Sequence, residues 1–270
     1  MPDTATSDTA ACELVETRQG KVVTLTLNRP GSLNAFSMAM FRGLIEAFER
    51  LGADMDVGAI ILRGEGRSFC VGGDVKGWAD RGDWTHEKHL EEMRWKQRLP
   101  LLMKTCPKVI IAQLHGHVLG AGFSLALAAD FRIATDTAVF GTSFAGVGFA
   151  GDFGATSSLL QLVGPAKARE LMMLNPRLSA TEALGLGLLT KMVPEAEVAA
   201  EAQALAEKLA SGPYVAWGYM KRNLLAAESE SMAVVLDTEV VSQARCTTTE
   251  DHQEAIRAFT EKRAPVFRGR

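Results

Sequence analysis

The sequence predicts an α/β fold. Short apolar runs, such as 59–62 and 109–114, have the composition of strands buried on both faces of a sheet. Longer segments between them carry apolar residues at helical spacing, and glycine-rich turns join several strands to the helices that follow. Alternation of strand and helix is typical of an α/β core with crossover connections.

The first elements are predicted to be a β-hairpin and a helix. β-Forming residues at 14–18 and 22–27 flank Gln19-Gly20-Lys21, which is the pattern of two strands joined by a tight turn. Ser37 precedes a helical pattern and is expected to cap that helix. Its buried stripe is predicted to contain Phe41, Leu44, Ile45, Phe48 and Leu51.

The alternation continues along the middle of the chain. We expect a strand at 59–62, a long helix at about 87–104, a strand at 109–114, a helix after Ala121 and a strand at 131–134. From Gly154 onward the pattern is almost entirely helical, and Ser179 with Glu182 forms a capping-box pattern. We therefore divide the chain into a flexible tail (1–11), an α/β core (12–193) and a helical C-terminal region (194–270).

Composition and charge favour an ordinary globular protein that acts on small molecules. The 270 residues are 47% hydrophobic and 23% charged, with a net charge of −3. Without dense Lys/Arg runs, a surface for nucleic acid or an anionic membrane is not expected. The four cysteines are scattered without a CxxC pair, which indicates neither a zinc site nor disulfides and favours the cytoplasm. The longest apolar runs are far shorter than the ~20 residues that cross a bilayer.

Two glycine-rich turns carry the chemical signal. They are Ser68-Phe69-Cys70-Val71-Gly72-Gly73-Asp74-Val75-Lys76 and Gly116-His117-Val118-Leu119-Gly120-Ala121-Gly122-Phe123-Ser124. A backbone N–H can approach a ligand oxygen closely where no bulky side chain intervenes. The second turn also opens a helix, whose N-terminal end is electropositive. Neither turn has the spacing of a dinucleotide-binding loop or a P-loop, so paired backbone donors for another ligand oxygen are expected.

Motifs along nearly the whole chain resemble the crotonase, or enoyl-CoA hydratase/isomerase, superfamily. They occur in the family's order: Leu27-Asn28-Arg29-Pro30 with Leu33-Asn34-Ala35, then 69–76, 116–123, Asp130 with Arg132-Ile133-Ala134, and Ala258-Phe259-Thr260-Glu261-Lys262-Arg263. The resemblance implies a spiral of repeated ββα units with a helical C-terminal region used in trimerisation. The assembly it implies is a homotrimer, or a hexamer made of two trimers.

The resemblance also implies the site. The backbone N–H groups of Gly73 and Ala121 would form an oxyanion hole for the thioester carbonyl of an acyl-CoA substrate, and losing one such donor costs about 3 to 4 kcal/mol of barrier. Coenzyme A would be part of the substrate, with no separate cofactor and no metal. The implied CoA-binding residues are Asn34, Ala35, Asp74, Val75, Lys76, Gly120, Phe144, Phe259 and Lys262, the last two at the adenine end, from the same chain or a neighbouring one.

The positions that hold two glutamates in family hydratases carry Ser124 and Phe144 here. Asp152 lies farther along the same loop, where it resembles the base of some bacterial enoyl-CoA isomerases and the nucleophile of the 4-chlorobenzoyl-CoA dehalogenase branch. A lone base beside an enolate trap suits moving a double bond. We therefore expect an enoyl-CoA isomerase with Asp152 as catalytic proton shuttle.

Several alternatives stay open. The chain could be an enoyl-CoA hydratase, an acyl-CoA hydrolase, a dehalogenase or a non-catalytic acyl-CoA-binding protein, although Trp95 stands where the dehalogenase branch has its histidine. Asp152 could instead be only the N-cap of the helix that follows. Desolvation by Phe144, Phe149 and Phe153 would raise its pKa, whereas the helix N-terminus would lower it.

The predicted 87–104 helix and the adjoining loops supply candidates for an acyl pocket. Met93, Trp95, Leu99, Phe144 and Phe149 suggest an apolar or aromatic pocket, although such residues are more often core. We expect Glu87, Glu91 and Glu92 to face solvent, and His86 with His89 to form a solvated pair rather than a metal site.

Overall fold

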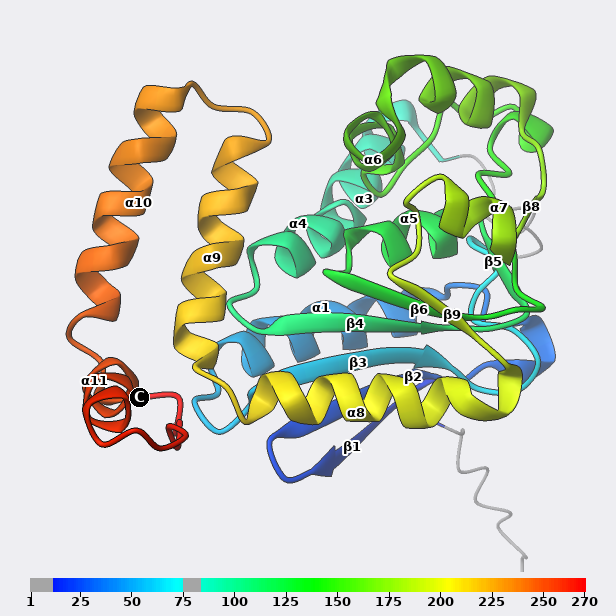
Figure 1. Cartoon of the computed structure of the whole chain (residues 1–270). Helices are drawn as coiled ribbons and strands as arrows, with labels where there is room; N and C mark the ends of the chain where they lie inside the picture. Colours follow the sequence, from blue (N-terminus) through cyan, green and yellow to red (C-terminus); the bar gives the residue numbers. More distant parts are fainter. Residues whose placement is uncertain (1–11, 75–83) are drawn as a thin grey trace, which may run out of the picture.

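The computed structural model describes residues 12–74 and 84–270, and its centre is a six-stranded sheet (Figure 1). The strands, in the order in which they lie, are β1 (Leu14–Gln19), β2 (Val22–Leu27), β3 (Ala59–Gly64), β4 (Val109–Leu114), β6 (Phe131–Thr135) and β9 (Lys191–Val193). β1 and β2 are antiparallel and the other neighbours are parallel. The predicted hairpin and the three predicted central strands are confirmed.

A second, smaller sheet contains the second strand of the ββα units. It contains β5 (His117–Leu119), β7 (Val139–Gly141) and β8 (Leu178–Ser179). β4, β5 and α5 (Ala121–Ala128) follow one another, as do β6, β7 and α6 (Ala155–Arg169), which are the ββα units expected from the sequence. Isolated bridges from Cys70 to Val118 and from Phe36 to Gly73 extend this sheet toward the first glycine turn.

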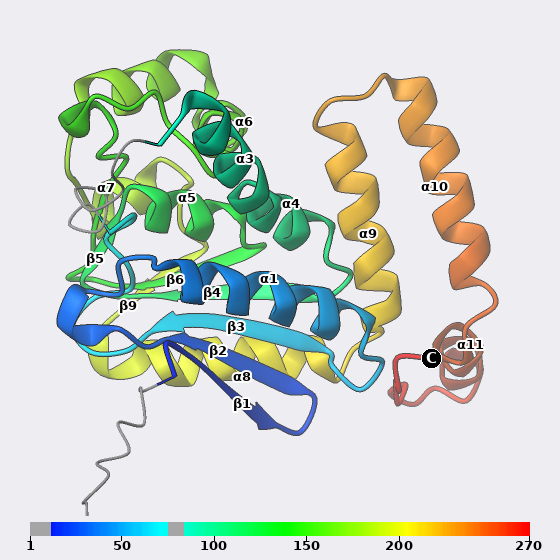
Figure 2. The same ribbon diagram turned by 180° about the vertical axis from the view of Figure 1, so that it is seen from behind.

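Helices cover both faces of the six-stranded sheet. On one face, α8 (Val198–Ala210) packs its alanines against a layer of strand residues that includes Ile61, Ile111 and Ile133. On the other face lie α1 (Met38–Ala53), α4 (Arg98–Thr105) and α5, which enclose the larger core (Figures 1 and 2). Every residue of β4 is buried, as its apolar composition predicts for a strand covered on both sides.

Local capping signals in the sequence are confirmed. The Ser37 side chain accepts a hydrogen bond from the N–H of Met40 (3.1 Å) at the start of α1, and the predicted apolar stripe of that helix is buried. Ser179 and Glu182 form the reciprocal capping box of α7 (Ala180–Gly185).

The single helix predicted at 87–104 is wrong, because the segment forms α3 (His86–Lys96) and α4, joined at Gln97. Pro100 explains the break. A continuous helix would need an N–H at position 100 to donate to the Lys96 carbonyl, and the proline ring would clash with that carbonyl. Pro100 is tolerated because it lies in the first turn of α4, where an N–H has no helical acceptor.

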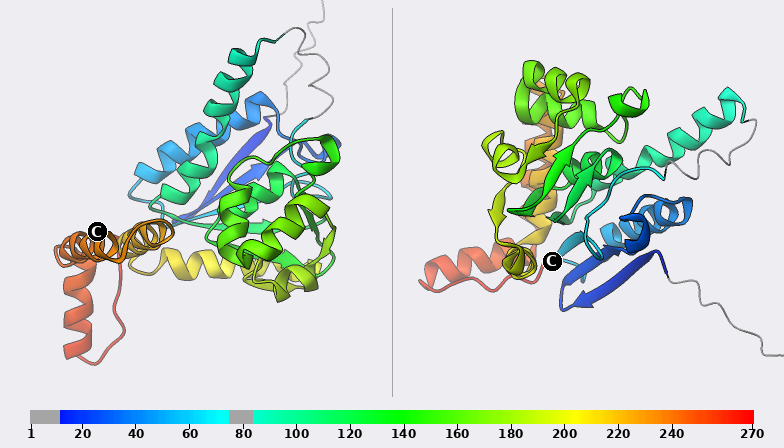
Figure 3. Two further views of the ribbon diagram at one scale, coloured as in Figure 1. Left: turned by 90° about the horizontal axis from the view of Figure 1, so that it is seen from above. Right: turned by 90° about the vertical axis from the view of Figure 1, so that its right-hand side faces the viewer.

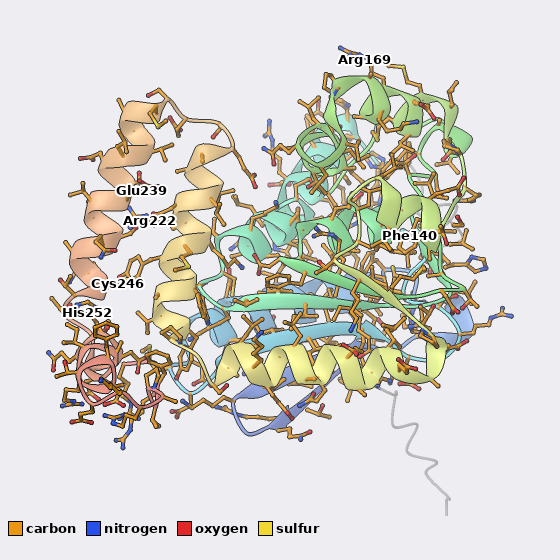
Figure 4. All side chains as sticks on the ribbon, viewed as in Figure 1. Phe140, Arg169, Arg222, Glu239, Cys246 and His252 are labelled. Carbon is orange, nitrogen blue, oxygen red and sulfur yellow. The ribbon has the colours of Figure 1, made fainter. Side chains whose placement is uncertain are left out.

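The last three helices form an arm that projects from the core (Figures 1 and 3). They are α9 (Tyr214–Ala227), α10 (Met232–Cys246) and α11 (Glu250–Thr260). An ion pair between Lys221 of α9 and Asp130 (2.7 Å) ties the arm to the core. In Figure 4 Phe140 lies in the core, whereas Cys246 and His252 lie on the arm. α8 packs on the sheet and only α9–α11 stand apart; the division at 193/194 stays a prediction.

Among the described residues, no helix combines the length and the apolar character needed to cross a bilayer.

Candidate active site

A pocket of about 780 Å³ lies where the two glycine turns meet α1, α3 and the loop before α6. Its lining combines glycines, aromatic rings, three carboxyl groups and one lysine. The lining residues include Phe36, Phe41, Gly72, Gly73, Asp74, His89, Glu92, Met93, Lys96, Gly120, Ala121, Phe144, Phe149, Asp152 and Phe153. The structure thus brings six of the twelve site residues expected from the sequence into one pocket, while their chemical roles stay predictions.

Backbone pairing fixes the first glycine turn. The N–H of Cys70 donates to the His117 carbonyl (3.1 Å), the N–H of Leu119 donates to the Cys70 carbonyl (2.9 Å), and the N–H of Phe36 donates to the Gly72 carbonyl (2.8 Å). Gly72 has a φ of +97°, a conformation that L side chains rarely adopt. These constraints hold Gly73 beside the pocket in one conformation.

The second turn places Ala121 as the first residue of α5, after Gly120 with its φ of 55°. An N–H at this position has no acceptor within the helix, so it is free to bind a ligand oxygen. A Cβ added to Gly72 would lie 3.1 Å from the Ala121 nitrogen, which shows how closely the two turns approach. Gly73 and Ala121 both line the pocket where these turns approach each other, and their action as paired donors stays a prediction.

The motif around Arg29 and Asn34 supports the first turn from behind. Asn34 is fully buried; its Oδ1 accepts from the Arg29 N–H (2.8 Å), and its Nδ2 donates to the carbonyls of Glu65 (2.8 Å) and Ser68 (2.7 Å). Arg29 donates to the Ala35 carbonyl (2.6 Å) and pairs with Asp74 (3.1 Å). Asn34 and Ala35 do not line the pocket, whereas the neighbouring Phe36 and Asp74 do.

Asp152 lies in the loop before α6 with its carboxyl in the pocket. Its Oδ1 atom is buried and has no hydrogen-bond partner among the described residues. The N-cap of α6 is Gly154, without a side-chain cap, so the alternative that Asp152 is merely a helix cap is wrong. Burial raises the pKa of Asp152 to about 6, and the positive charge of Lys96 opposes this rise. A carboxyl in this condition is suited to accept a proton near neutral pH.

Aromatic rings form the wall around Asp152. Phe153 stacks on Phe41, with 5.1 Å between ring centroids and 3° between planes, and Phe36 lies 4.8 Å from Phe41. Phe153 has a φ of +50°, and its N–H donates to the Oε1 of Gln97 (3.0 Å). This unusual backbone conformation directs the Phe153 ring inward beside the carboxyl that precedes it.

Helix α3 differs from the sequence expectation on one face. Glu92 does not face solvent, because its side chain is 10% exposed and forms an ion pair with the buried Lys96. His89, Glu92, Met93 and Lys96 line the pocket together. Their spacing of three and four residues marks one helix face, so the signal was present, but polar residues there suggested solvent. Trp95 and Leu99 pack in or against the core and do not line the pocket.

The two positions where hydratases carry glutamate have different surroundings here. Ser124 is buried, and its hydroxyl donates to the Gly120 carbonyl (3.2 Å) inside α5. Phe144 is buried and lines the pocket with its ring. Neither residue offers a carboxyl to the site.

Besides Asn34 and Ala35, four further predicted CoA contacts are not among the described lining residues. Val75 and Lys76 lie outside the described residues. Phe259 and Lys262 lie in and just beyond α11 on the arm, and Phe259 is 87% exposed. In the single chain neither residue lines the pocket, so their role at the adenine end stays a prediction that needs a neighbouring chain. Among the described residues no group of His, Cys, Asp and Glu could hold a metal ion.

Comparisons with known proteins agree with this geometry. A family model described as enoyl-CoA hydratase/isomerase matches residues 17–270. The chain is 33% identical to 1,2-epoxyphenylacetyl-CoA isomerase of Escherichia coli over 92% of this chain and 95% of that one. It is 32% identical to short-chain-enoyl-CoA hydratase of Clostridium acetobutylicum, over 91% and 94%. The crystal structure of an enoyl-CoA hydratase from Polaromonas matches with a TM-score of 0.88 and 30% identity, over 93% and 98%.

Proposed function

The chain belongs to the enoyl-CoA hydratase/isomerase family, and from this premise we propose that it is an enoyl-CoA isomerase with Asp152 as proton shuttle. One observation carries the proposal. In the pocket lined by Gly73 and Ala121, the carboxyl of Asp152 has a buried oxygen without a partner among the described residues, and its pKa is raised to about 6.

The reaction begins with a 3-enoyl-CoA whose thioester oxygen accepts from the two backbone N–H groups. Asp152 removes a proton from C2, and the C–H electron pair becomes part of a dienolate whose negative charge is concentrated on the thioester oxygen. The protonated Asp152 then returns the proton to C4. The double bond moves from C3=C4 to C2=C3, and no water or other co-reactant is consumed.

Isomerisation is favoured over hydration because hydration requires one acid to activate water and another to protonate carbon. Three carboxylates line the pocket, but Asp74 pairs with Arg29 and Glu92 pairs with Lys96. Neither Ser124 nor Phe144 can replace a carboxylate. The relatives carry both hydratase and isomerase names, and one of them is an isomerase of an epoxyphenylacetyl-CoA.

The acyl group is proposed to be apolar or aromatic, because phenylalanine rings surround the carboxyl of Asp152. Coenzyme A is proposed to enter as part of the substrate, with no resident cofactor. A homotrimer or hexamer is proposed because the arm of the single chain exposes large apolar side chains, which typically mark an association surface. These are Met220, Leu224, Met232, Val234, Leu236, Val240, Val241, Ile256 and Phe259.

The test follows conversion of 3-enoyl-CoA to the conjugated 2-enoyl-CoA by absorbance. We expect the native protein to turn over and Asp152→Asn to lose roughly 10²- to 10⁴-fold in kcat, the range for removal of a general base. Asp136→Asn, at an exposed turn, is the matched control. If the native protein binds acyl-CoA but leaves 3-enoyl-CoA unchanged and hydrates 2-enoyl-CoA instead, the isomerase proposal is wrong.

A further inference from the structure

An ion pair lies inside the wall of the acyl pocket, where an apolar side chain would be expected. Lys96 and Glu92, four residues apart on α3, have side chains that are 7% and 10% exposed. Lys96 is the only buried residue of this helix. Withdrawing two charges from water is costly, and a buried pair commonly adds little to stability compared with apolar residues of similar size. A pair retained at this position therefore needs an explanation other than stability.

Contacts connect this pair to Asp152 in two ways. The Lys96 ammonium lies 5.3 Å from the centroid of Phe41, the ring that stacks on Phe153 next to Asp152. Gln97, the residue after Lys96, accepts from the N–H of Phe153 (3.0 Å). The end of α3 is thus hydrogen-bonded directly to the loop that carries Asp152. These contacts restrain the Lys96 ammonium relative to the Asp152 carboxyl.

Within the pair, it is the charge of Lys96 that acts on Asp152. Lys96 is the charge that lowers the pKa of Asp152 against the effect of burial. The described ion pairs include Lys96 with Glu92 but none of Lys96 with Asp152. A direct pair would satisfy the carboxylate and weaken it as a base, so the engagement of Lys96 by Glu92 keeps Asp152 available.

We propose that Glu92 and Lys96 are positioning residues for Asp152: Lys96 favours its ionised form, and Glu92 restrains the ammonium from pairing with it. This inference rests on the proposed role of Asp152 as the base. The other titratable groups of the described pocket wall are His89, on the same helix, and Asp74, which pairs with Arg29 on the opposite side. Both stay unchanged in the variants below.

The test compares a variant that removes one charge of the pair with a variant that removes both. Glu92→Gln releases Lys96 toward Asp152. The double variant Glu92→Gln with Lys96→Met removes both charges, so that it leaves no lone buried charge to unfold the protein. Arg94→Met and Glu91→Gln, exposed on the same helix, are matched controls for each charge change. Each protein is followed by the acid limb of kcat/KM for 3-enoyl-CoA and by infrared titration of the Asp152 carboxyl, taken as the difference from Asp152→Asn.

We expect the two variants to shift the titration in opposite directions. The double variant moves the acid limb and the infrared titration to higher pH, on the order of one pH unit, the lower end for loss of a nearby opposite charge. Glu92→Gln moves both to lower pH and lowers the plateau kcat on the order of tenfold, because a paired carboxylate is a weaker base. In the two control variants neither the acid limb nor the infrared titration shifts.

Shifts in the same direction, or no shift in either variant while the fold is intact, overturn the inference. The infrared readout separates it from the proposed function. If opposite shifts are seen in the titration of Asp152 but no protein isomerises 3-enoyl-CoA, the positioning pair stands and the isomerase proposal fails. If isomerisation depends on Asp152 but the titration of its carboxyl is unchanged in both variants, the positioning role is wrong and the isomerase proposal stands.

Discussion

Replacing Asp152 with asparagine is expected to make the folded protein more stable at neutral pH while it removes activity. Burial raises the pKa of this carboxyl from an ordinary 3.8 to about 6. The folded chain therefore binds the proton more tightly than the unfolded chain does. The free energy of unfolding falls as pH rises from about 4 to about 6, because over this range the carboxyl ionises more readily in the unfolded chain than in the folded chain.

The size of the effect follows from the two pKa values. One pKa unit corresponds to about 1.4 kcal/mol, so the ionised carboxyl costs the folded state about 3 kcal/mol above pH ~6 and almost nothing below pH ~4. Asparagine avoids the charge but still buries a polar amide. We therefore expect Asp152→Asn to raise the free energy of unfolding by about 1 to 3 kcal/mol above pH ~6.

Urea unfolding of the native protein and the variant, at pH values below about 4 and above about 6, measures this difference. Asp54→Asn is a control of opposite sign, because a hydrogen bond from the Asp56 N–H lowers the pKa of Asp54. Loss of the Asp54 carboxylate is therefore expected to destabilise the folded protein at neutral pH, and this effect fades in acid. If Asp152→Asn destabilises the protein above pH ~6, or if its effect is the same at both pH values, the argument from desolvation is refuted.

Three further predictions concern the reaction and the arm. In the native protein kcat/KM for 3-enoyl-CoA falls tenfold per pH unit below about 6, because a protonated Asp152 cannot accept a proton; a flat acid side contradicts its role as base. Gly72→Ala puts a Cβ 3.1 Å from the Ala121 nitrogen and is expected to lower kcat on the order of 10²-fold. The control is Gly187→Ala, where φ is +75° and the added Cβ meets open space, so that only stability is lost. Equal kcat values in the two variants refute the donor pairing. Leu224→Glu on the exposed face of α9 lowers the mass seen in sedimentation velocity; an unchanged mass excludes that face from the interface.

Sequence patterns predicted the parts of this site that are built from backbone and turns. The two glycine-rich turns were predicted to lie at the site, and both line the pocket. The positive φ angles of Gly72 and Gly120 within them were found only in the structure. The capping serines, the hairpin and the strands are likewise local features whose physical cause lies within a few residues. Asp152 was identified by resemblance, because the sequence alone did not distinguish a base from a helix cap.

The remaining parts depend on contacts between distant segments. The spacing of Glu92, Met93 and Lys96 marks one face of α3, but because most of its residues are polar the sequence did not show that this face lines the pocket while Glu91 is exposed. The balance between burial and the charge of Lys96 at Asp152 required both elements to be seen together. Phe259 does not line the pocket of the single chain, so its predicted contact with the adenine end of CoA depends on how chains assemble, which the sequence does not show.

The break at Gln97, which Pro100 enforces, makes the placement of Glu92 and Lys96 depend on a residue outside the pocket lining. At Gln97 the backbone has a ψ of −9°, whereas a regular helix has a ψ of about −42°. A residue that permits a continuous helix would rotate the pocket-lining face of α3 and carry Glu92 and Lys96 with it. Divergence among relatives could thus proceed through the angle between two helices, and a comparison confined to pocket residues would not detect it.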